Sequence, residues 1–443
     1  MRKHLYIVIA ILYSVLCIPA AAQDFARITE RTISGTARYI GMAGAMSAIG
    51  GDPSAALDNP AGLGLYRHTE VLLSLDHTWD FTRQNGTTNA RQRNIFGAPQ
   101  ASLVVTLPTD AGETGVQFNN IMISYRRLHS YNRTIYASAA NSPSLGALLA
   151  STGVDMGIAY CADPYNAANT LSLNEFGATN EFSINWAMNI SNRWYVGAGL
   201  NMMSYSLSSE AQYNEDFFSP FSRQIYNTNS TTLQYKGVGC ALSAGLIYRP
   251  AEWVRIGFGI QTPSLGSLRI YSTGTLYAQT DSLRSSIAPD LVTTITKFHQ
   301  PLRTSASVAF QIGLYGMIAL QYDFLHRFDA DDVHTLKAGV EVIPVPGLYL
   351  NAGYAYESTF KTKDIPVSVD PILERQDTYF QRLRNSQYAS FAIGYRGANV
   401  IVQAAYQFRW QNTNLYAHEN ITTPYMINAD THRFVVTFGW HHY

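Results

Sequence analysis

The side chains that could carry out chemistry form no recognisable catalytic or metal-binding motif. The sequence contains no Gly-x-Ser-x-Gly nucleophile element, no His-Glu-x-x-His zinc element and no phosphate-binding loop. Its 11 histidines are scattered, and the one adjacent pair, His441-His442, lies at the C-terminus. We therefore predict no enzymatic activity, no catalytic residue, no metal site and no cofactor. Haem capture by the histidine pair is the alternative to two ordinary surface histidines.

Ionisable side chains also occur on the polar face of segments that alternate apolar and polar residues. They are Asp323, Lys337, Glu341, Glu357 and Arg409. If these segments enclose an interior, such groups could form a protease site, since some barrel proteins are enzymes. The simpler interpretation is that they pair with one another across the interior, because a buried charge is stable only beside a partner.

Composition argues against a nucleic-acid partner. Lys plus Arg and Asp plus Glu both number 31, and no basic cluster occurs along the chain. Tyrosine dominates the aromatic residues, and charged residues make up only 14% of the chain. This balance is typical of a protein that meets water on some faces and lipid or sugar on others.

The N-terminus has the features of an export signal. Met1-Arg2-Lys3-His4 is positively charged, Leu5 to Ile18 is apolar, and Ala20-Ala21-Ala22 offers a cleavage site. We predict a signal peptide over residues 1–22, with an uncleaved N-terminal membrane anchor as the alternative. In the mature chain only Cys161 and Cys240 remain. They could form a disulfide in an exported protein or stay as two unpaired small residues.

Alternation of apolar and polar residues is the dominant signal in the mature chain. It contains no apolar run of about 18 residues, so it has no transmembrane helix. Segments such as 182–190 and 399–411 alternate over nine residues or more, and even positions of the latter are predicted to face lipid. Aromatic residues often end the apolar face, as in a transmembrane β-barrel. A soluble β-sandwich is the alternative.

The turns and loops give a topology for this all-β fold. We predict an antiparallel transmembrane barrel of 14 strands over residues 69–443, in which 267–278 extends the strand at 252–262. Long polar loops are expected at 130–175, 209–228, 263–300, 359–386 and 412–430. The expected short turns lie at Asn192, Pro250 to Glu252, Gly313-Leu314, Pro344 to Gly347 and Gly397-Ala398. Short turns belong to the periplasmic side of bacterial barrels, which puts both termini there.

The segment before the first strand does not alternate. Residues 35–66 are rich in Gly and Ala, a composition that fits either a flexible linker or a compact plug packed against a barrel wall. Asp58-Asn59-Pro60 is expected to form a turn, because Asn and Asp bond nearby backbone and Pro fixes φ.

Several motifs resemble the FadL/TodX family of outer-membrane transporters for hydrophobic compounds. The N-terminal ones are Gly41 to Ala45, Asp52 to Ala56, and the run Asn59, Pro60, Ala61, Gly62 and Leu63, which is similar to the family's hatch. Two further stretches agree, at 239–263 and at 352–356. The remainder is compatible in layout, so the resemblance covers most of the chain.

The resemblance implies a 14-stranded barrel in the outer membrane of a Gram-negative cell, with residues 23–68 as a hatch in the lumen. It implies passive uptake of a hydrophobic small molecule of the fatty-acid or aromatic-hydrocarbon type, held near the hatch and released sideways. Expected partners are this ligand, membrane lipid and lipopolysaccharide, and the barrel-assembly machinery, which reads a terminal aromatic such as Tyr443. We expect a monomer. A general porin for polar solutes, a barrel enzyme and an adhesin are the alternatives.

The third predicted strand contains a slip in its alternation. Val116 and Phe118 are apolar at even positions, whereas Ile121 and Ile123 are apolar at odd ones. A β-bulge at Asn119-Asn120 would restore the register. The family is known for an inward kink in its third strand, so we predict that Asn119 and Asn120 mark a lateral gate. The alternative is a strand that starts at Ile121.

Overall fold

The computed structural model describes residues 27–88, 90–109, 114–142, 167–219, 222–279, 284–287, 291–327, 332–358, 379–417 and 423–442. The predicted signal peptide, Cys161 and Tyr443 lie outside these residues. Cys240 is a free and exposed cysteine.

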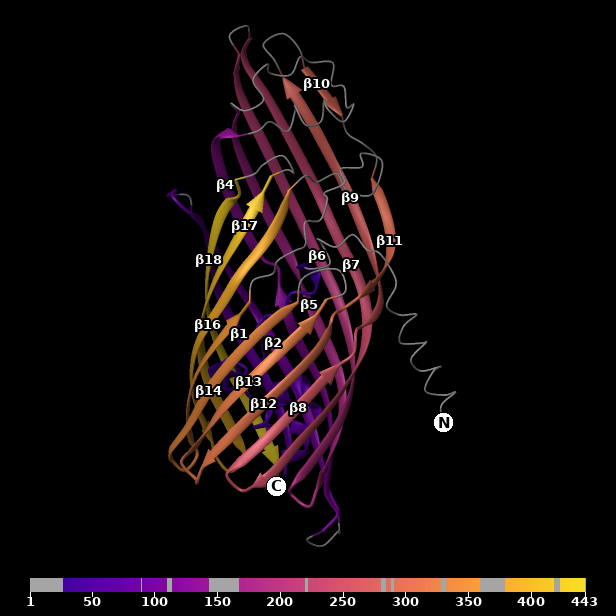
Figure 1. Ribbon diagram of the computed structural model, residues 1–443, viewed down its shortest axis with the longest axis vertical. Helices are drawn as coiled ribbons and strands as arrows, with labels where there is room; N and C mark the ends of the chain where they lie inside the picture. The colour runs from indigo at the N-terminus through magenta and orange to yellow at the C-terminus, as the bar shows by residue number, and fades with distance from the viewer. Residues whose placement is uncertain are drawn as a thin grey trace.

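Almost all described residues after the first 42 belong to one antiparallel sheet, which closes because β1 pairs with β18 (Figure 1). The strands are β1 (Thr69–Gln84), β2 (Ala90–Pro108), β3 (Val116–Ser130), β4 (Arg133–Ser142), β5 (Ala167–Ile190), β6 (Trp194–Ser219), β7 (Ser222–Ala251), β8 (Val254–Gln261), β9 (Leu265–Gln279), β10 (Arg284–Ile287), β11 (Val292–His299), β12 (Leu302–Ile312), β13 (Gly316–His326), β14 (Val333–Val345), β15 (Leu348–Glu357), β16 (Phe380–Arg396), β17 (Val400–Tyr416) and β18 (Tyr425–His442).

These segments form 14 barrel strands, as predicted. β4 continues β3, since both pair with β5, and β9 continues β8, since both pair with β7. β10, β11 and β12 form one interrupted strand, because the first two pair with β9 and the third with β8. The prediction that 267–278 extends the preceding strand is therefore confirmed.

The outer surface carries the apolar belt of a transmembrane barrel. On β17, Val400, Val402, Tyr406 and Trp410 are exposed, whereas the intervening inward positions such as Ile401 are buried. This confirms that even positions of 399–411 face outward. Among the described residues, no helix is both long and apolar enough to cross a membrane.

The two ends of the barrel differ. The five short turns lie where predicted, at the end where β1 begins and β18 finishes (Figure 1). At the other end most of the predicted loop residues that the structure describes are strand, for instance 209–219 in β6 and 222–228 in β7, whereas 143–166 and 359–378 lie outside the described residues. The loop prediction was wrong there because polar residues were taken as loop. Beyond the belt the outer face of a strand is polar, and some buried inward positions such as Ser209 and Glu215 are polar as well. Polarity therefore no longer marks a turn there.

The chain before β1 lies inside the barrel. We name residues 27–68 the lumenal segment; it contains α3 (Ala37–Gly41), α4 (Pro53–Asp58) and the 3-10 helix η1 (Pro60–Leu65). α3 contacts β15 to β18, whereas η1 contacts β3, β5, β6 and β7 across the lumen. The predicted barrel with a small plug in its lumen is thus the observed architecture.

A charge placed on the belt tests the membrane assignment. Leu320 is 51% exposed at the middle of β13's outward face, and Leu314 is 85% exposed in the turn before that strand. Leu320→Arg should lower the free energy of unfolding in lipid by about 2–4 kcal/mol, and Leu314→Arg by about 0–1 kcal/mol, because the cost falls toward the interface. Equal costs in a denaturant titration would contradict the depth assignment.

Candidate functional site

Side-chain caps fold the lumenal segment locally. Thr36 caps α3 by accepting from Tyr39 N, and Asp52 caps α4 by accepting from Ser54 N at 2.8 Å. The two caps are joined, since Thr36 Oγ1 donates to Asp52 Oδ2 at 2.7 Å. Such caps satisfy backbone donors that short helices leave unpaired. The Gly-rich run is therefore an ordered unit.

The predicted hatch residues Asn59 to Leu63 are all buried. Asn59 ends α4 and caps η1 by accepting from Ala61 N at 3.2 Å. Its amide Nδ2 donates to Ser47 O at 3.0 Å and to Leu246 O of β7 at 3.4 Å. Asn59 thus joins two parts of the segment to the wall, at the place where a turn was expected.

Glycines in the wall let the segment approach closely. A Cβ at Gly245 of β7 would lie 1.9 Å from Asn59 Oδ1, and one at Gly197 of β6 would lie 2.4 Å from Pro60 C. On the opposite side, a Cβ at Gly353 of β15 would lie 2.3 Å from Met42 C. Gly245 and Gly353 belong to the two stretches that resemble the FadL/TodX family. At both positions a larger side chain would overlap the lumenal segment.

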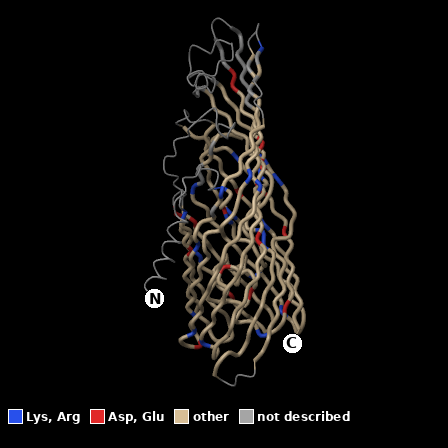
Figure 2. The backbone as a smooth tube through the Cα atoms, turned by 90° about the vertical axis from the view of Figure 1, so that its right-hand side faces the viewer, with Lys and Arg blue, Asp and Glu red and all other residues tan. Residues whose placement is uncertain are grey.

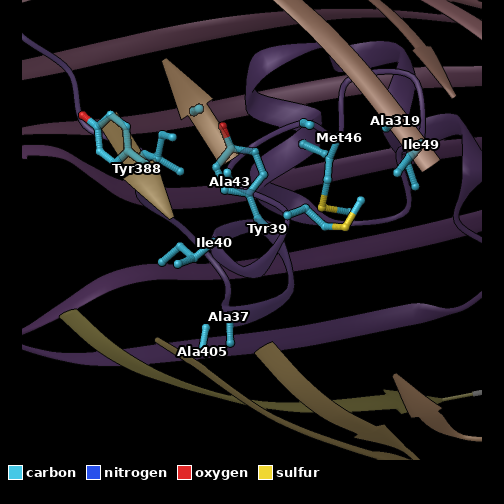
Figure 3. Close-up of a cluster of buried hydrophobic side chains, with 14 of the residues drawn as sticks. Ala37, Tyr39, Ile40, Ala43, Met46, Ile49, Ala319, Tyr388 and Ala405 are labelled. Atoms are coloured by element: carbon cyan, nitrogen blue, oxygen red, sulfur yellow. The ribbon is translucent and has the colours of Figure 1, made fainter. Parts of the chain in front are cut away.

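An apolar cluster fixes the first half of the segment against β13, β16 and β17. Tyr39, Ile40, Met46 and Ile49 point among wall side chains, and Figure 3 shows them near Ala319, Tyr388 and Ala405. All of these residues are at most 3% exposed. The segment therefore packs like a small protein core within the barrel.

Asp58 is the electrostatic centre of the lumen. Its Oδ1 accepts from Arg126 of β3 at 3.0 Å and from Arg303 of β12 at 2.8 Å, and its Oδ2 accepts from Tyr39. Burial opposes ionisation of the carboxyl, but Arg303 and Arg126 outweigh it and hold the pKa of Asp58 well below its ordinary range. A single carboxylate thus bridges strands on two sides of the barrel.

The inward charges predicted from sequence largely pair. Asp323 binds Lys337 at 2.7 Å, Glu341 binds Arg38 at 2.6 Å, and Arg409 binds Glu30 at 2.9 Å. Glu357 lines a cavity and has no ion-pair partner in the described part of the chain. Within the described residues no group of three or more His, Cys, Asp or Glu is arranged to hold a metal ion. The pairing of these inward charges favours a structural role, in which ion pairs stabilise the barrel interior, over a catalytic one.

The predicted bulge at Asn119-Asn120 is wrong. Pairing with β2 and with β5 is unbroken from Phe118 to Arg126, and the register shift lies at Gln117. The shift at Gln117 changes the face of Val116 relative to the rest of β3. Phe118 has the inward parity of Asn120 and packs under the Arg67 guanidinium, whose carbon lies 4.5 Å from the ring centroid. The alternative that the strand begins at Ile121 is also wrong, since β3 begins at Val116.

Asn120 nevertheless belongs to the site. Its amide Nδ2 donates to Leu63 O at 2.7 Å and to Tyr66 O at 3.2 Å, so it holds η1 to β3. Asn119 is half-buried, and among the described residues no side-chain hydrogen bond or ion pair links it to the lumenal segment. The predicted hatch and the third strand are therefore in contact. The contact consists of hydrogen bonds from Asn120 and does not involve a kink at Asn119-Asn120.

Sequence reasoning missed a break in the wall beside the segment. The β2–β3 ladder ends at the pair Gln100–Arg126, and Ala90 to Gly97 of β2 pair with β1 alone among the described residues. Two residues of β2, Ala98 and Pro99, stand opposite Leu75 of β1. Pro99 has no N–H to donate to a ladder, and this was the available sequence signal.

Side chains cross this break, which we name the β2–β3 seam. Arg127 of β3 reaches past Gly97 to Asp76 of β1, with Nη2 to Oδ2 at 2.5 Å. Farther from the short turns, Arg93 of β2 donates to Glu175 O at 3.2 Å. The seam is therefore closed by side chains rather than by backbone bonds.

Two small cavities lie on the segment. One, of about 80 Å³, is lined by Arg31, Asp58, Arg303 and Glu357 together with apolar residues such as Leu128. The other, of about 90 Å³, extends from Glu30 to Arg127 and to Ile95 of β2, at the seam. An internal space therefore connects the surface of the segment to the break in the wall.

Arg31 in the first cavity is hydrogen-bonded to neutral side chains only, among the described residues. Its guanidinium donates to the amide oxygens of Gln261 at 3.1 Å and Gln300 at 2.8 Å, and no ion pair joins it to a carboxylate in the described chain. Burial lowers the pKa of Arg31 to about 10. An additional acceptor would stabilise this cation.

Apolar side chains line the lumen above the segment. Ile28 packs with inward residues of β3, β6, β7, β9 and β11, among them Leu128, Tyr205, Tyr235 and Phe298. A second cluster farther out joins β4, β5 and β6 to β17 and β18. Inward positions of a water-filled pore are polar, so these buried apolar clusters argue against a water-filled lumen at this height.

Comparison of folds places the barrel among known structures. No protein-family model matches the chain, and no curated protein sequence matches it. A Pseudomonas aeruginosa FadL homologue has 13% sequence identity and a TM-score of 0.62, covering 93% of this chain and 99% of that chain.

Two further solved structures are similar. The Pseudomonas putida toluene transporter TodX has 13% identity and a TM-score of 0.55, covering 92% of this chain and 98% of that one. The Ralstonia pickettii toluene transporter TbuX has 14% identity and a TM-score of 0.54, covering 93% and 99%. These structures are transport channels, and at such identities the likeness concerns the fold: this chain has the fold of the FadL- and TodX-type channels.

Proposed function

We propose that this chain is an outer-membrane channel for the passive uptake of hydrophobic small molecules. Residues 23–68 act as its hatch, with Asn59 to Leu63 and Asn120 holding it in place, and residues 69–443 form the barrel. The end with the short turns, and both termini, face the periplasm. The ligand rests on the hatch and leaves sideways into the bilayer through the β2–β3 seam.

One observation carries this proposal: the β2–β3 ladder ends where the lumenal segment touches both strands. Gln100 accepts a hydrogen bond from Ser54 of α4, and Arg126 is paired with Asp58 at the end of α4. A molecule resting on α4 therefore lies beside the part of the wall where the backbone hydrogen bonds between β2 and β3 have just ended. An apolar molecule that leaves sideways does not have to cross a water-filled pore, where exposure of its apolar surface to water is unfavourable.

The cavity chemistry favours an amphiphile with an acidic head. Arg31 offers a half-buried cation with no carboxylate ion pair in the described chain, and Leu128 and Ile33 supply apolar contact in the same cavity. Charge-assisted hydrogen bonds from a guanidinium to a carboxylate are short and strong. Of the two ligand types expected, this supports a fatty-acid-like molecule over a neutral aromatic hydrocarbon.

The alternatives have less support. A general porin needs an open lumen, whereas the lumenal segment contacts strands on opposite sides of the barrel. A barrel enzyme needs reactive groups at the outer rim, whereas the ionisable groups described here are mostly paired inside. We propose a monomer without a cofactor or nucleic-acid partner.

Deleting residues 35–62 removes α3, α4 and the caps that join them. The deletion variant should show a large and steady conductance in planar bilayers, because ions can then pass the lumen, and the full-length barrel should not. Heat-modifiable electrophoretic mobility would verify that the variant is folded. A folded variant as tight as the full-length barrel, or an equally leaky full-length barrel, would argue against a hatch.

Removing the bulge tests the exit route. Deleting Ala98 and replacing Pro99 by Val leaves one residue opposite Leu75 and restores an N–H, so the β2–β3 ladder can extend. This variant should lose uptake of labelled dodecanoate at least about tenfold while remaining folded and non-conducting. Pro99→Ala keeps the bulge and should retain uptake. Unchanged uptake with the ladder restored would exclude the seam as the exit.

Arg31→Gln tests the ligand class. Binding of dodecanoate should weaken at least about tenfold, since hydrogen bonds to charged groups contribute about 1.5–3 kcal/mol, and binding of dodecanol should not change. Arg67→Gln is the matched control, because Arg67 lies at the other end of the segment and bonds Gly64 O and Asn192. Equal loss for both ligands, or loss for neither, would contradict an acid-binding role.

A further inference from the structure

Three exposed cations lie on the outer face of the barrel, on β7, β9 and β11. These strands lie toward the right of Figure 1, the side that faces the viewer in Figure 2. Lys236 of β7 pairs directly with Arg269 of β9, and Lys297 of β11 pairs with Ser267, two residues from Arg269. All three side chains are exposed. Directly opposite residues have Cβ atoms about 5 Å apart, and diagonal ones about 7–8 Å. They lie 28 to 61 positions apart in sequence, so inspection of the sequence found no basic cluster.

Among the described residues of the adjoining strand segments, no acidic residue lies beside this cluster. The neighbouring stretches 194–209, 230–248, 262–279 and 291–302 contain no Asp or Glu. In the described part of the chain no ion pair involves any of the three cations. Like charges directly opposite one another destabilise a sheet. The described part of the chain thus supplies no counter-charge to the cluster, which is free to bind an external anion.

The cluster stands at the edge of the apolar belt. Val238, two residues from Lys236, is 63% exposed, and Leu265, four residues from Arg269, is 57% exposed. On the far side of the cluster lie hydroxyl groups together with the exposed Ile295, which pairs with Arg269. Arg269 Nη1 donates to Tyr271 OH at 3.2 Å. This sequence of apolar, cationic and hydroxyl groups along the wall complements the acyl chains, phosphates and sugars of a lipid.

A buried core fixes the spacing of the cations. The residues adjacent to them, Tyr235, Leu268 and Phe298, are at most 1% exposed and pack in one cluster inside the barrel. The three strands therefore hold their outward side chains on a rigid support. Because the backbone positions are fixed, binding has to order only the three side chains.

We propose that Lys236, Arg269 and Lys297 bind the phosphate groups of lipopolysaccharide in the outer leaflet. Arg269 can contact a phosphate with two parallel hydrogen bonds, and the two lysines act as point charges beside it. The site uses the orientation given for the proposed function, in which long strands extend outward, and is independent of the ligand route. It anchors the barrel wall to the lipid layer that a ligand must pass.

The test measures binding of bisphosphorylated lipid A to the full-length protein in detergent by native mass spectrometry. Lys236→Gln/Arg269→Gln/Lys297→Gln should bind lipid A at least about tenfold more weakly than the unmodified protein. Arg83→Gln/Arg91→Gln/Arg193→Gln removes three exposed cations elsewhere and should bind within about twofold of it. Circular dichroism and heat-modifiable mobility verify folding, and Arg269→Gln alone, expected to lose about threefold, replaces the triple variant if that misfolds.

Lipid A without phosphates separates charge recognition from contact with acyl chains. It should bind the unmodified protein and the triple variant equally weakly, and a charge-conserving variant, Lys236→Arg/Lys297→Arg, should bind phosphorylated lipid A normally. Full binding by the triple variant would overturn the proposal, and so would equal affinity of the unmodified protein for lipid A with and without phosphates.

Discussion

The ion pairs of Asp58 are the interaction on which the rest of this structure depends. A carboxylate this deeply buried is tolerated only with partners, and Arg126 and Arg303 supply them from two sides of the lumen. Removing one partner of a buried pair costs about 3–5 kcal/mol, whereas an exposed surface pair contributes about 0–1 kcal/mol. The pairs thus fix the end of α4 at one height, and that height decides where the cavities and the seam lie.

Backbone fit complements this electrostatic anchor. Gly197, Gly245 and Gly353 leave space for the backbone of the lumenal segment, and Asn120 and Asn59 hydrogen-bond across the remaining distance. The backbone of the lumenal segment is therefore complementary in shape to the inner wall of this barrel. In the proposed function, a segment held this way blocks polar solutes. Beside it, β2 and β3 lack backbone hydrogen bonds along Ala90 to Gly97.

Local sequence patterns predicted much of the fold. The period of two identified the lipid face of β17, and the five short turns together with 267–278 gave the strand number, because both depend on neighbours in the chain. Asn59 followed from local turn chemistry. The limits of the polar strand ends, such as 209–219, were missed because alternation loses its meaning where no face meets lipid.

The remaining errors concern contacts between distant residues. The alternation slip near Asn119 depends on the register shift at Gln117, and the seam depends on Pro99 standing opposite β3. The cluster of Lys236, Arg269 and Lys297 exists only once three strands are in register. Single residues in a sequence show neither register nor partners, so such features become visible only in the folded barrel.

Solute selectivity in whole cells tests the central claim most directly. The barrel would be produced in a Gram-negative strain that lacks its own porins and fatty-acid channels, and entry of labelled dodecanoate and labelled glucose would be followed side by side. The account predicts faster entry of dodecanoate and no change for glucose, relative to cells without the barrel. Faster glucose entry, or dodecanoate entry equal to that of cells without the barrel, would contradict a sealed channel for hydrophobic molecules.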